Sequence, residues 1–393
     1  MRYDSHIVDM RRVKWLLRFT VGLLIGIVVL ELCARLDDYI SYGAPPWSVY
    51  NVDTLWQRDS LGWKGKPGAR YKQWQLNSLG YRGPELIPGR IPIVCLGASE
   101  TFGLYEGPGQ EYPRQLERIL NARAGGKYFE VVNVSLAGET VRSATRRVPE
   151  IVQAIHPRIA LIYPSVAGYI WLPWLHTPPA DTQPPPQRFQ WRIGENLREL
   201  LKQALPSVVQ NWLREQEIER FAALYPVMDR VPEENIRVFR SDVEALVDSL
   251  RSHEVQPVLV THATRFGRHL SLADRRLLVS WRKFYPMLRE GGFLDMEERM
   301  NDALREVAAQ RGVLLIDAAR EVPPGEQNFA DYAHFTAAGA QIMADRLADG
   351  LQPLLVPYLE KEAASTAFAS GAAGGSLVSN AGRPAQHVPA VGH

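Results

Sequence analysis

Short apolar runs alternate with helically spaced apolar residues along the middle of the chain. The runs are bounded by glycine, proline or polar residues, as buried strands are, and fall at 91–96, 128–134, 159–163, 257–261 and 313–317. Helical spacing occupies 112–124, 140–155, 235–253, 275–311 (with breaks at Pro286 and Gly291-Gly292) and 336–351. Strands that alternate with helices predict a three-layer α/β fold, with a parallel sheet of about five strands covered on both faces.

The N-terminus carries one continuous apolar stretch, Trp15 to Ala34, of roughly 20 residues, which suffices for one transmembrane helix. Basic residues lie before and at the start of the stretch, namely Arg11, Arg12, Lys14 and Arg18, and the acidic residues Asp37 and Asp38 follow it. By the positive-inside rule, the chain is predicted to cross the inner (cytoplasmic) membrane once and to place its remainder on the periplasmic side. A cleaved signal peptide is the alternative, although its apolar region is usually shorter, roughly 7 to 15 residues.

The same patterns predict the domain organisation. Residues 1–40 are expected to form the cytoplasmic N-terminus and anchor, 41–90 a wrapping segment, 91–360 the main domain, and 361–393 a disordered tail. A proline- and tryptophan-rich insertion, at about 170–235, interrupts the main domain. Three interpretations of its Trp171 and Trp174 stay open: a lid that presents aromatic rings to a substrate, a structural flap, or a surface for a partner protein.

Composition excludes several classes of function. A net charge of +2 leaves no broad basic field for nucleic acid. Cys33 and Cys95 lie in separate settings, so neither a disulfide nor a cysteine metal site is expected. The set His262, His269 and Asp295 lacks the spacing of a metal site, and no cofactor is expected.

Two short segments far apart in the chain carry candidate chemistry. Ser99 follows the first predicted strand of the main domain, where open α/β sheets place their reactive groups. Asp331 and His334 lie three residues apart, just before the last predicted helix. A serine hydroxyl becomes a useful nucleophile when a histidine that is oriented by a carboxylate takes its proton. The two segments together therefore predict serine-based acyl transfer.

The order of these motifs resembles the SGNH (GDSL-type) hydrolase family, including its membrane-anchored, exported members. The similar segments are Leu-Gly-Ala-Ser-Glu-Thr-Phe-Gly at 96–103, Asn-Val-Ser-Leu-Ala-Gly at 133–138, Asp-Tyr-Ala-His at 331–334 and a lead-in at 77–85. The resemblance implies that Ser99 is the nucleophile, His334 the base and Asp331 the acid. It further implies that the backbone N–H groups of Ser99 and Gly138 bind the oxyanion.

The chain departs from the family pattern at two positions. Ala98 stands where the family usually has aspartate, which is not the triad acid. More seriously, the third block normally offers an asparagine amide to the oxyanion, and the chain has Pro-Ser-Val-Ala-Gly at 164–168 instead. The Ser165 hydroxyl is the expected substitute donor. Loss of one donor costs about 10²–10³ in rate.

Three further side chains are predicted to contact the substrate: Asn133, His262 and Trp171. For each, a structural role is the competing interpretation. The leading function is an esterase acting on O-acyl groups of a small molecule or of a cell-envelope or exported polysaccharide. An O-acyltransferase with the same triad is the second hypothesis. A non-catalytic envelope protein that binds glycan or a protein partner is the third.

Overall fold

The computed structural model describes residues 4–42, 55–176, 191–194, 227–267, 269–282 and 284–374, together with positions 197, 209, 212, 216, 219 and 220. The chain divides into two compact units, residues 1–347 and 348–393. Much of the predicted insertion, the Trp174 side chain and residues 375–393 of the predicted tail lie outside the described residues.

A five-stranded sheet forms the centre of the first unit. Its strands are β5 (Ile91–Gly97), β6 (Phe129–Asn133), β7 (Ile159–Tyr163), β8 (Gln256–Val260) and β9 (Leu314–Ile316). They pair in the order β6-β5-β7-β8-β9, and every pairing is parallel. Strands β6 and β7 are buried along their whole length, as strands covered on both faces must be. The predicted fold class is therefore confirmed.

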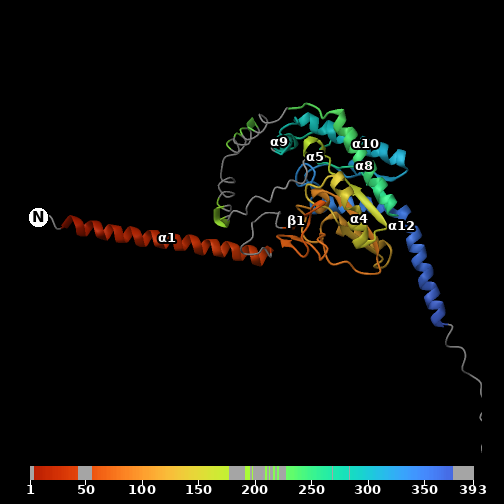
Figure 1. The fold of residues 1–393 in the computed structure, drawn as a ribbon, viewed down its shortest axis with the longest axis horizontal. Helices are drawn as coiled ribbons and strands as arrows, with labels where there is room; N and C mark the ends of the chain where they lie inside the picture. Colours follow the sequence, from red (N-terminus) through yellow and green to blue (C-terminus); the bar gives the residue numbers. More distant parts are fainter. Residues whose placement is uncertain are drawn as a thin grey trace, which may run out of the picture. The chain divides into compact units, whose positions relative to one another are not determined.

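Helices pack on both faces of this sheet (Figure 1). On one face, Val94, Leu96 and Ile162 share a core with α4 (Val141–Ile155), α8 (Glu233–Ser252) and α10 (Glu290–Arg311). On the other face, the Tyr163 ring meets Tyr112 of α3 (Tyr112–Arg123) and Phe335, which precedes α12 (Ala337–Gly374). The described part of the main domain also contains the shorter helices η2 (Ala167–Tyr169), α5 (Pro173–His176), α9 (Leu272–Trp281) and α11 (Ala318–Glu321).

Two predicted helix boundaries were wrong. Gly291 and Gly292 do not interrupt α10, which begins at Glu290. A Cβ on Gly292 would lie 2.5 Å from the Asp229 carbonyl oxygen, so this glycine allows close packing instead of ending a helix. The last helix was expected to end near Leu351, but α12 continues to Gly374 and includes Pro353 and Pro357. It therefore extends into the start of the predicted tail.

Two small antiparallel hairpins precede the sheet. They are β1 (Trp56–Asp59) with β2 (Gly62–Gly65), and β3 (Arg70–Tyr71) with β4 (Trp74–Gln75). Leu55, Tyr71, Trp74 and Leu76 pack around Phe102 of α2 (Ser99–Phe102). This segment therefore supports the short helix that begins with Ser99.

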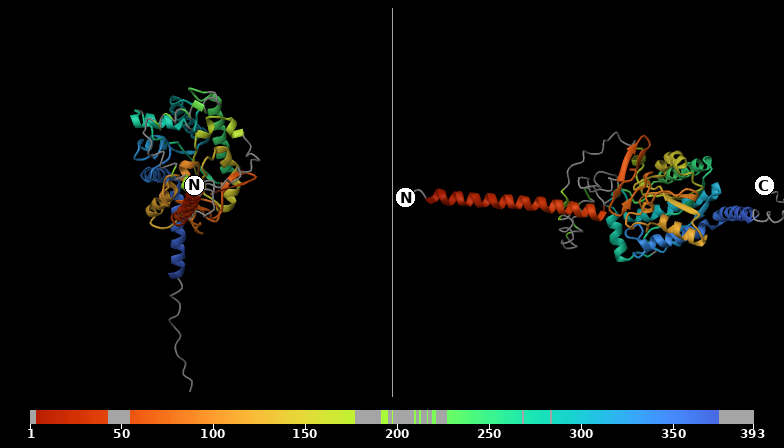
Figure 2. Two further views of the ribbon diagram at one scale, coloured as in Figure 1. Left: turned by 90° about the vertical axis from the view of Figure 1, so that its left-hand side faces the viewer. Right: turned by 90° about the horizontal axis from the view of Figure 1, so that it is seen from below.

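The N-terminal helix α1 (Asp4–Tyr42) is one continuous helix (Figure 2). Its stretch Arg12–Ile40 is long and apolar enough to cross a membrane, with a mean hydropathy of 2.2 over its most apolar window. Only 6% of that window is buried in the protein, which distinguishes it from the core helix of a soluble domain. Membrane-spanning helices and signal sequences share these properties.

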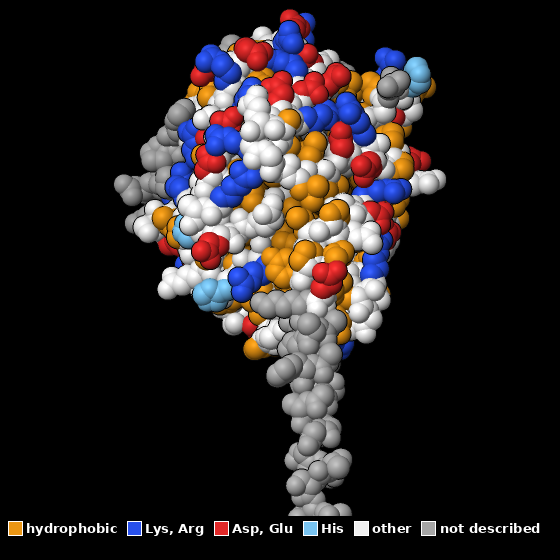
Figure 3. Space-filling view, turned by 90° about the vertical axis from the view of Figure 1, so that its right-hand side faces the viewer, with side chains coloured by type: hydrophobic (Ala, Val, Ile, Leu, Met, Phe, Trp, Pro, Cys, Tyr) orange, Lys and Arg blue, Asp and Glu red, His pale blue; other side chains and the backbone are white. Residues whose placement is uncertain are grey.

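The surface of the main domain carries charges of both signs. On the face in Figure 3, Lys and Arg side chains intermix with Asp and Glu, and hydrophobic side chains lie between them. No single-sign field covers this face, which agrees with the nearly balanced composition.

Candidate active site

The candidate site lies where the order of the sheet reverses. The chain passes from β5 outward to β6, and then returns to β7 on the opposite side of β5. In open α/β sheets, ligands bind at such a point, beyond the carboxyl ends of the strands. Ser99 follows β5 and Ser165 follows β7, so the topology places these two serines at the same edge of neighbouring strands.

A tight turn after β5 presents Ser99. Helix α2 begins at Ser99 itself, and the Phe102 N–H donates to the Ala98 carbonyl oxygen at 2.8 Å. A Cβ on Gly97 would lie 2.0 Å from Thr101 Oγ1 and 2.7 Å from the Tyr163 carbonyl oxygen. Glycine at position 97 is therefore required for α2 to fold back against the sheet.

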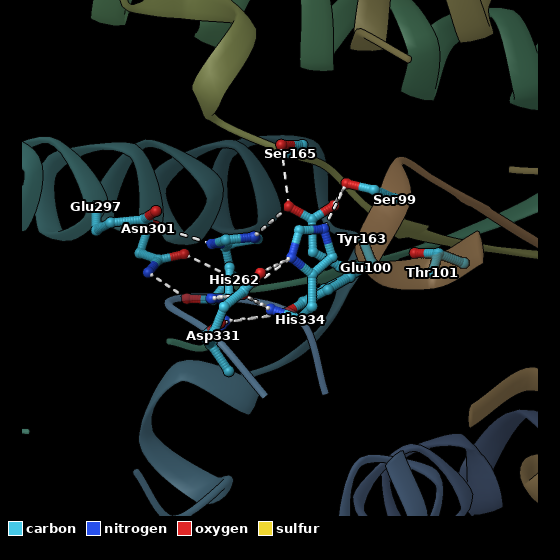
Figure 4. Close-up of polar contacts among 12 residues, drawn as sticks. Ser99, Glu100, Thr101, Tyr163, Ser165, His262, Glu297, Asn301, Asp331 and His334 are labelled. Carbon is cyan, nitrogen blue, oxygen red and sulfur yellow. Dashed lines mark hydrogen bonds and ion pairs between the residues drawn. The ribbon is translucent and has the colours of Figure 1, made fainter. Parts of the chain in front are cut away.

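The predicted triad residues meet in one hydrogen-bonded line (Figure 4). His334 Nε2 lies 2.8 Å from Ser99 Oγ. On the other side of the ring, His334 Nδ1 lies 2.8 Å from Asp331 Oδ2 and 2.9 Å from Asp331 Oδ1. A histidine held this way is able to take the serine proton through Nε2 while Nδ1–H donates to the carboxylate.

Asp331 is held by its own loop. The Ala333 and His334 backbone N–H groups donate to Asp331 Oδ1 at 3.1 and 2.9 Å, and the Tyr105 hydroxyl donates to Oδ2 at 3.1 Å. Burial alone would raise the pKa of the Asp331 carboxyl, but its bonds with His334 outweigh burial and lower that pKa. Burial alone would lower the pKa of His334, but Asp331 and the nearby charge of Glu100 outweigh burial and raise it.

The second motif, residues 133–138, contributes an exposed turn at one end and a buried asparagine at the other. Gly138 adopts a left-handed conformation with φ of 78° and is exposed, so its backbone is accessible to solvent. Asn133 is completely buried, and its amide donates to the Thr101 carbonyl oxygen at 2.8 Å. Asn133 therefore ties β6 to α2, and its contact with a substrate stays a prediction.

Ser165 does not present a free hydroxyl in this arrangement. Ser165 Oγ donates to Glu100 Oε1 at 3.3 Å, and Glu100 Oε2 lies 3.3 Å from Ser99 Oγ. The predicted substitute for the missing asparagine is thus engaged with a carboxylate that neighbours the nucleophile (Figure 4).

His262 and Trp171, the other two predicted substrate contacts, both pack against the protein, and their contact with a substrate stays a prediction. His262 follows β8 and is buried, with Nδ1 2.9 Å from Glu297 Oε2 and Nε2 3.5 Å from Glu100 Oε1. Its ring also stacks on Tyr163. Trp171 packs partly buried against the core shared by α4, α8 and α10. The contacts of His262 are thus with Glu100 and Glu297.

Besides Glu100, sequence patterns missed three residues that shape the site. Tyr105 bonds Asp331 and places its ring edge against His334, with a centroid separation of 5.6 Å. Glu297 lies within α10, where nothing distinguishes it from other glutamates on the helix. Arg82, in the 77–85 lead-in, donates from its buried guanidinium to the carbonyl oxygens of Phe102 and Gly103. In the sequence, only the position of Arg82 in that motif could have indicated a role near the site.

The chain is similar to a known protein family and to several solved structures. The model of the GDSL-like lipase/acylhydrolase family matches residues 95–342, more than half of the chain. No curated protein matches the chain. Similar solved structures include an acetylxylan esterase from Geobacillus stearothermophilus, crystallised as a catalytic mutant, which is 15% identical over 67% of this chain and 95% of that chain, with a TM-score of 0.39. The psychrotrophic esterase EstA from Pseudoalteromonas sp. is 11% identical (67% and 98% covered, TM-score 0.38), and a lipase/acylhydrolase from Enterococcus faecalis is 13% identical (67% and 96% covered, TM-score 0.38).

Proposed function

The chain belongs to the GDSL-like lipase/acylhydrolase family, and from this membership we propose that it is a serine esterase whose triad is Ser99, His334 and Asp331. One observation carries the proposal: His334 contacts Ser99 Oγ through one ring nitrogen and the Asp331 carboxylate through the other. That arrangement supplies the nucleophile, its base and the group that orients the base, in the roles that acyl transfer requires.

The mechanism follows from these contacts. His334 Nε2 takes the proton of Ser99 Oγ as the oxygen attacks an ester carbonyl carbon, and Asp331 stabilises the imidazolium that forms. His334 then gives the proton to the leaving alcohol, and Ser99 carries the acyl group. Water attacks the acyl-enzyme with His334 again as base, which releases the acid and restores the serine.

We assign the oxyanion to the backbone N–H groups of Ser99 and Gly138, with the Ser165 hydroxyl as a third donor. Ser165 adopts this role when its O–H proton rotates away from Glu100, a movement that needs no displacement of the oxygen. Donors aimed at the developing charge are often the largest single contribution to catalysis.

We propose as substrate an O-acyl group of a cell-envelope or exported polysaccharide, or of a smaller acylated molecule. The support is the proposed membrane topology of the chain together with its family. An O-acyltransferase has the same triad and differs only in the acceptor, so transfer to a glycan hydroxyl in the presence of an acyl donor distinguishes it. A non-catalytic glycan- or partner-binding envelope protein is favoured only by the missing third-block asparagine.

We further propose that α1 is retained as an anchor and that the main domain lies on the periplasmic side. Glu31 of α1 accepts hydrogen bonds from the backbone N–H groups of Arg192 and Ile193 at 2.9 and 3.0 Å, and Asp38 accepts from the Arg192 guanidinium at 3.1 Å. A cleaved signal peptide would lose these bonds. The organisation into anchor (1–40), wrapping segment (41–90), catalytic domain (91–360) and tail (361–393) is part of this proposal, and intact mass of the purified protein tests the retained anchor.

Labelling with a fluorophosphonate probe tests the activity directly. The full-length protein in detergent is expected to react at one site, because an activated serine attacks phosphorus as it attacks an ester carbonyl. Ser99→Ala is expected to abolish labelling, and His334→Ala to reduce it by at least about 10³-fold. Ser135→Ala removes another serine near the end of β6 and serves as the matched control, with labelling retained.

Absence of labelling in wild-type protein with a normal circular dichroism spectrum would overturn the esterase proposal and favour the binding protein. Labelling that persists in Ser99→Ala would place the nucleophile elsewhere. If labelling depends on Ser99, hydrolysis of p-nitrophenyl esters of increasing chain length then identifies the acyl group.

A further inference from the structure

A second chain of charged side chains lies behind the nucleophile. It runs from Glu100 through His262 to Glu297, with separations of 3.5 Å from Glu100 Oε1 to His262 Nε2 and 2.9 Å from His262 Nδ1 to Glu297 Oε2. The three side chains come from α2, from the end of β8 and from α10, and Figure 4 shows them in a row beside Ser99.

This chain is buried and held from several sides. The three residues are 5%, 2% and 6% exposed, respectively. Asn301 brackets the histidine, because its Oδ1 accepts from the His262 N–H at 2.7 Å and its Nδ2 donates to the His262 carbonyl oxygen at 2.9 Å. A buried charge is tolerated when it is paired and hydrogen-bonded, and each member here has an opposite charge as its neighbour.

The charge state of the chain follows from this pairing. Burial alone would raise the pKa of the Glu100 carboxyl, but the protonated His262 beside it outweighs burial and lowers that pKa. Burial alone would lower the pKa of His262, but Glu297 and Glu100 together outweigh burial and raise it. At neutral pH the chain therefore holds an ionised carboxylate against the nucleophile.

The Ser99 hydroxyl has one proton and two acceptors within reach. His334 Nε2 lies 2.8 Å from Ser99 Oγ, and Glu100 Oε2 lies 3.3 Å from it. When His334 is neutral, Nε2 accepts a hydrogen bond from the serine hydroxyl. When His334 is protonated, its Nε2–H donates to Ser99 Oγ, and the serine proton is left to Glu100.

We propose that Glu100, held by His262 and Glu297, is a positioning residue that acts as the alternative acceptor for the Ser99 hydroxyl and favours the protonated, resting form of His334. The inference rests on the proposed function, since it assumes that Ser99 is the nucleophile. In the resting form, the hydrogen bonds run from His334 to Ser99 to Glu100. As the pH rises, His334 Nε2 loses its proton to solvent, the serine hydroxyl turns to Nε2, and the site becomes reactive.

Other groups lie near His334 in both its protonated and its neutral form, and the test must take them into account. Asp331 accepts from the ring, and the rings of Tyr105 and Tyr332 lie edge-on to it. Glu106, in the loop after α2, is buried, and burial raises the pKa of its carboxyl to about 7. Its charge also favours protonated His334, so Glu106 broadens the pH profile of wild-type protein and of the variants below alike.

The pH dependence of fluorophosphonate labelling tests the inference on the full-length protein. We expect Glu100→Gln to move the acid limb of the second-order labelling rate to lower pH by about one unit, because His334 loses a neighbouring negative charge. His262→Asn is expected to move the limb in the same direction, because an unpaired buried Glu100 takes up a proton and becomes neutral. Each labelling rate is divided by the plateau rate of the same protein. At a pH one unit below the wild-type midpoint, this relative rate should be several-fold higher in both variants than in wild type.

Glu130→Gln is the matched control. Glu130 is a buried glutamate of β6 that pairs with Arg90, at the opposite end of the strand from the site, so the acid limb of this variant should coincide with that of wild type. An unchanged limb in Glu100→Gln, with only the plateau altered, would overturn the inference and leave Glu100 a packing residue. That result is distinct from failure of the proposed function, in which wild-type Ser99 would not label at any pH.

Discussion

Asp331→Asn removes one negative charge from the site and keeps the size of the side chain. In the native structure, Oδ1 accepts from the Ala333 and His334 backbone N–H groups and lies 2.9 Å from His334 Nδ1, whereas Oδ2 lies 2.8 Å from Nδ1 and 3.1 Å from the Tyr105 hydroxyl. The amide oxygen of asparagine must keep the position of Oδ1, because two N–H groups point there. The amide NH₂ therefore faces the imidazole ring.

The consequence is a change of tautomer. We expect Nδ1 to accept from the asparagine NH₂, which replaces the nearer carboxylate oxygen, Oδ2, so the ring proton moves to Nε2, which then points its N–H at Ser99 Oγ across 2.8 Å. A ring in that form cannot take the serine proton. Loss of the base through the wrong tautomer lowers kcat by about 10⁴ in a serine triad, which is about 5 kcal/mol of transition-state stabilisation. The fold should tolerate the change, because both backbone hydrogen bonds to the loop survive.

Two assays separate chemistry from stability. Hydrolysis of p-nitrophenyl acetate measures kcat and KM, and urea unfolding measures the free energy of unfolding. We expect Asp331→Asn to lose about 10⁴ in kcat with KM little changed. Asp331→Ala should be equally inactive and also less stable by about 1–3 kcal/mol, because two backbone N–H groups of the loop lose their acceptor. A loss of less than tenfold in Asp331→Asn would refute the assignment of Asp331 as the acid that orients His334.

Two further substitutions test the oxyanion site and the nucleophile turn. Ser165→Ala should lower kcat by about 10² with little change in KM, because one oxyanion donor is lost, and a loss under threefold would reduce Ser165 to a partner of Glu100. Gly97→Ala should lower the free energy of unfolding by about 2–3 kcal/mol in urea, since its Cβ would lie 2.7 Å from the Tyr163 carbonyl oxygen. Gly291→Ala, where a Cβ meets nothing within 4 Å, is the control, and equal stability losses in the two variants would contradict the packing argument.

The period of the hydrophobic pattern was sufficient to predict the fold class. Five apolar runs became the five strands of a parallel sheet, because a strand covered on both faces must be apolar at successive positions. The same pattern predicted the ends of helices less accurately. It placed a break at Gly291-Gly292 because glycine lowers helix propensity, whereas close packing of Gly292 against Asp229 decided the outcome.

The candidate site was likewise predicted only in part. Ser99 and the Asp331/His334 pair were predicted, because each belongs to a short segment whose residue types are readable together, and the structure brings the three into contact. The predicted substrate contacts of Asn133 and His262 lacked such support. Whether a polar side chain after a strand points toward solvent or into the protein depends on what packs behind it, which no local pattern reports.

The sequence by itself determined the alternation of strands and helices, the apolar N-terminal helix and the segments that carry the triad residues. Only the tertiary structure decided that Glu100, His262 and Glu297 form one buried chain beside the nucleophile. These residues are separated by many positions and share no spacing, because each is placed by a different element. Their charges and hydrogen bonds depend on a distance of a few ångströms between those elements, and that distance exists only after the sheet and α10 have packed together.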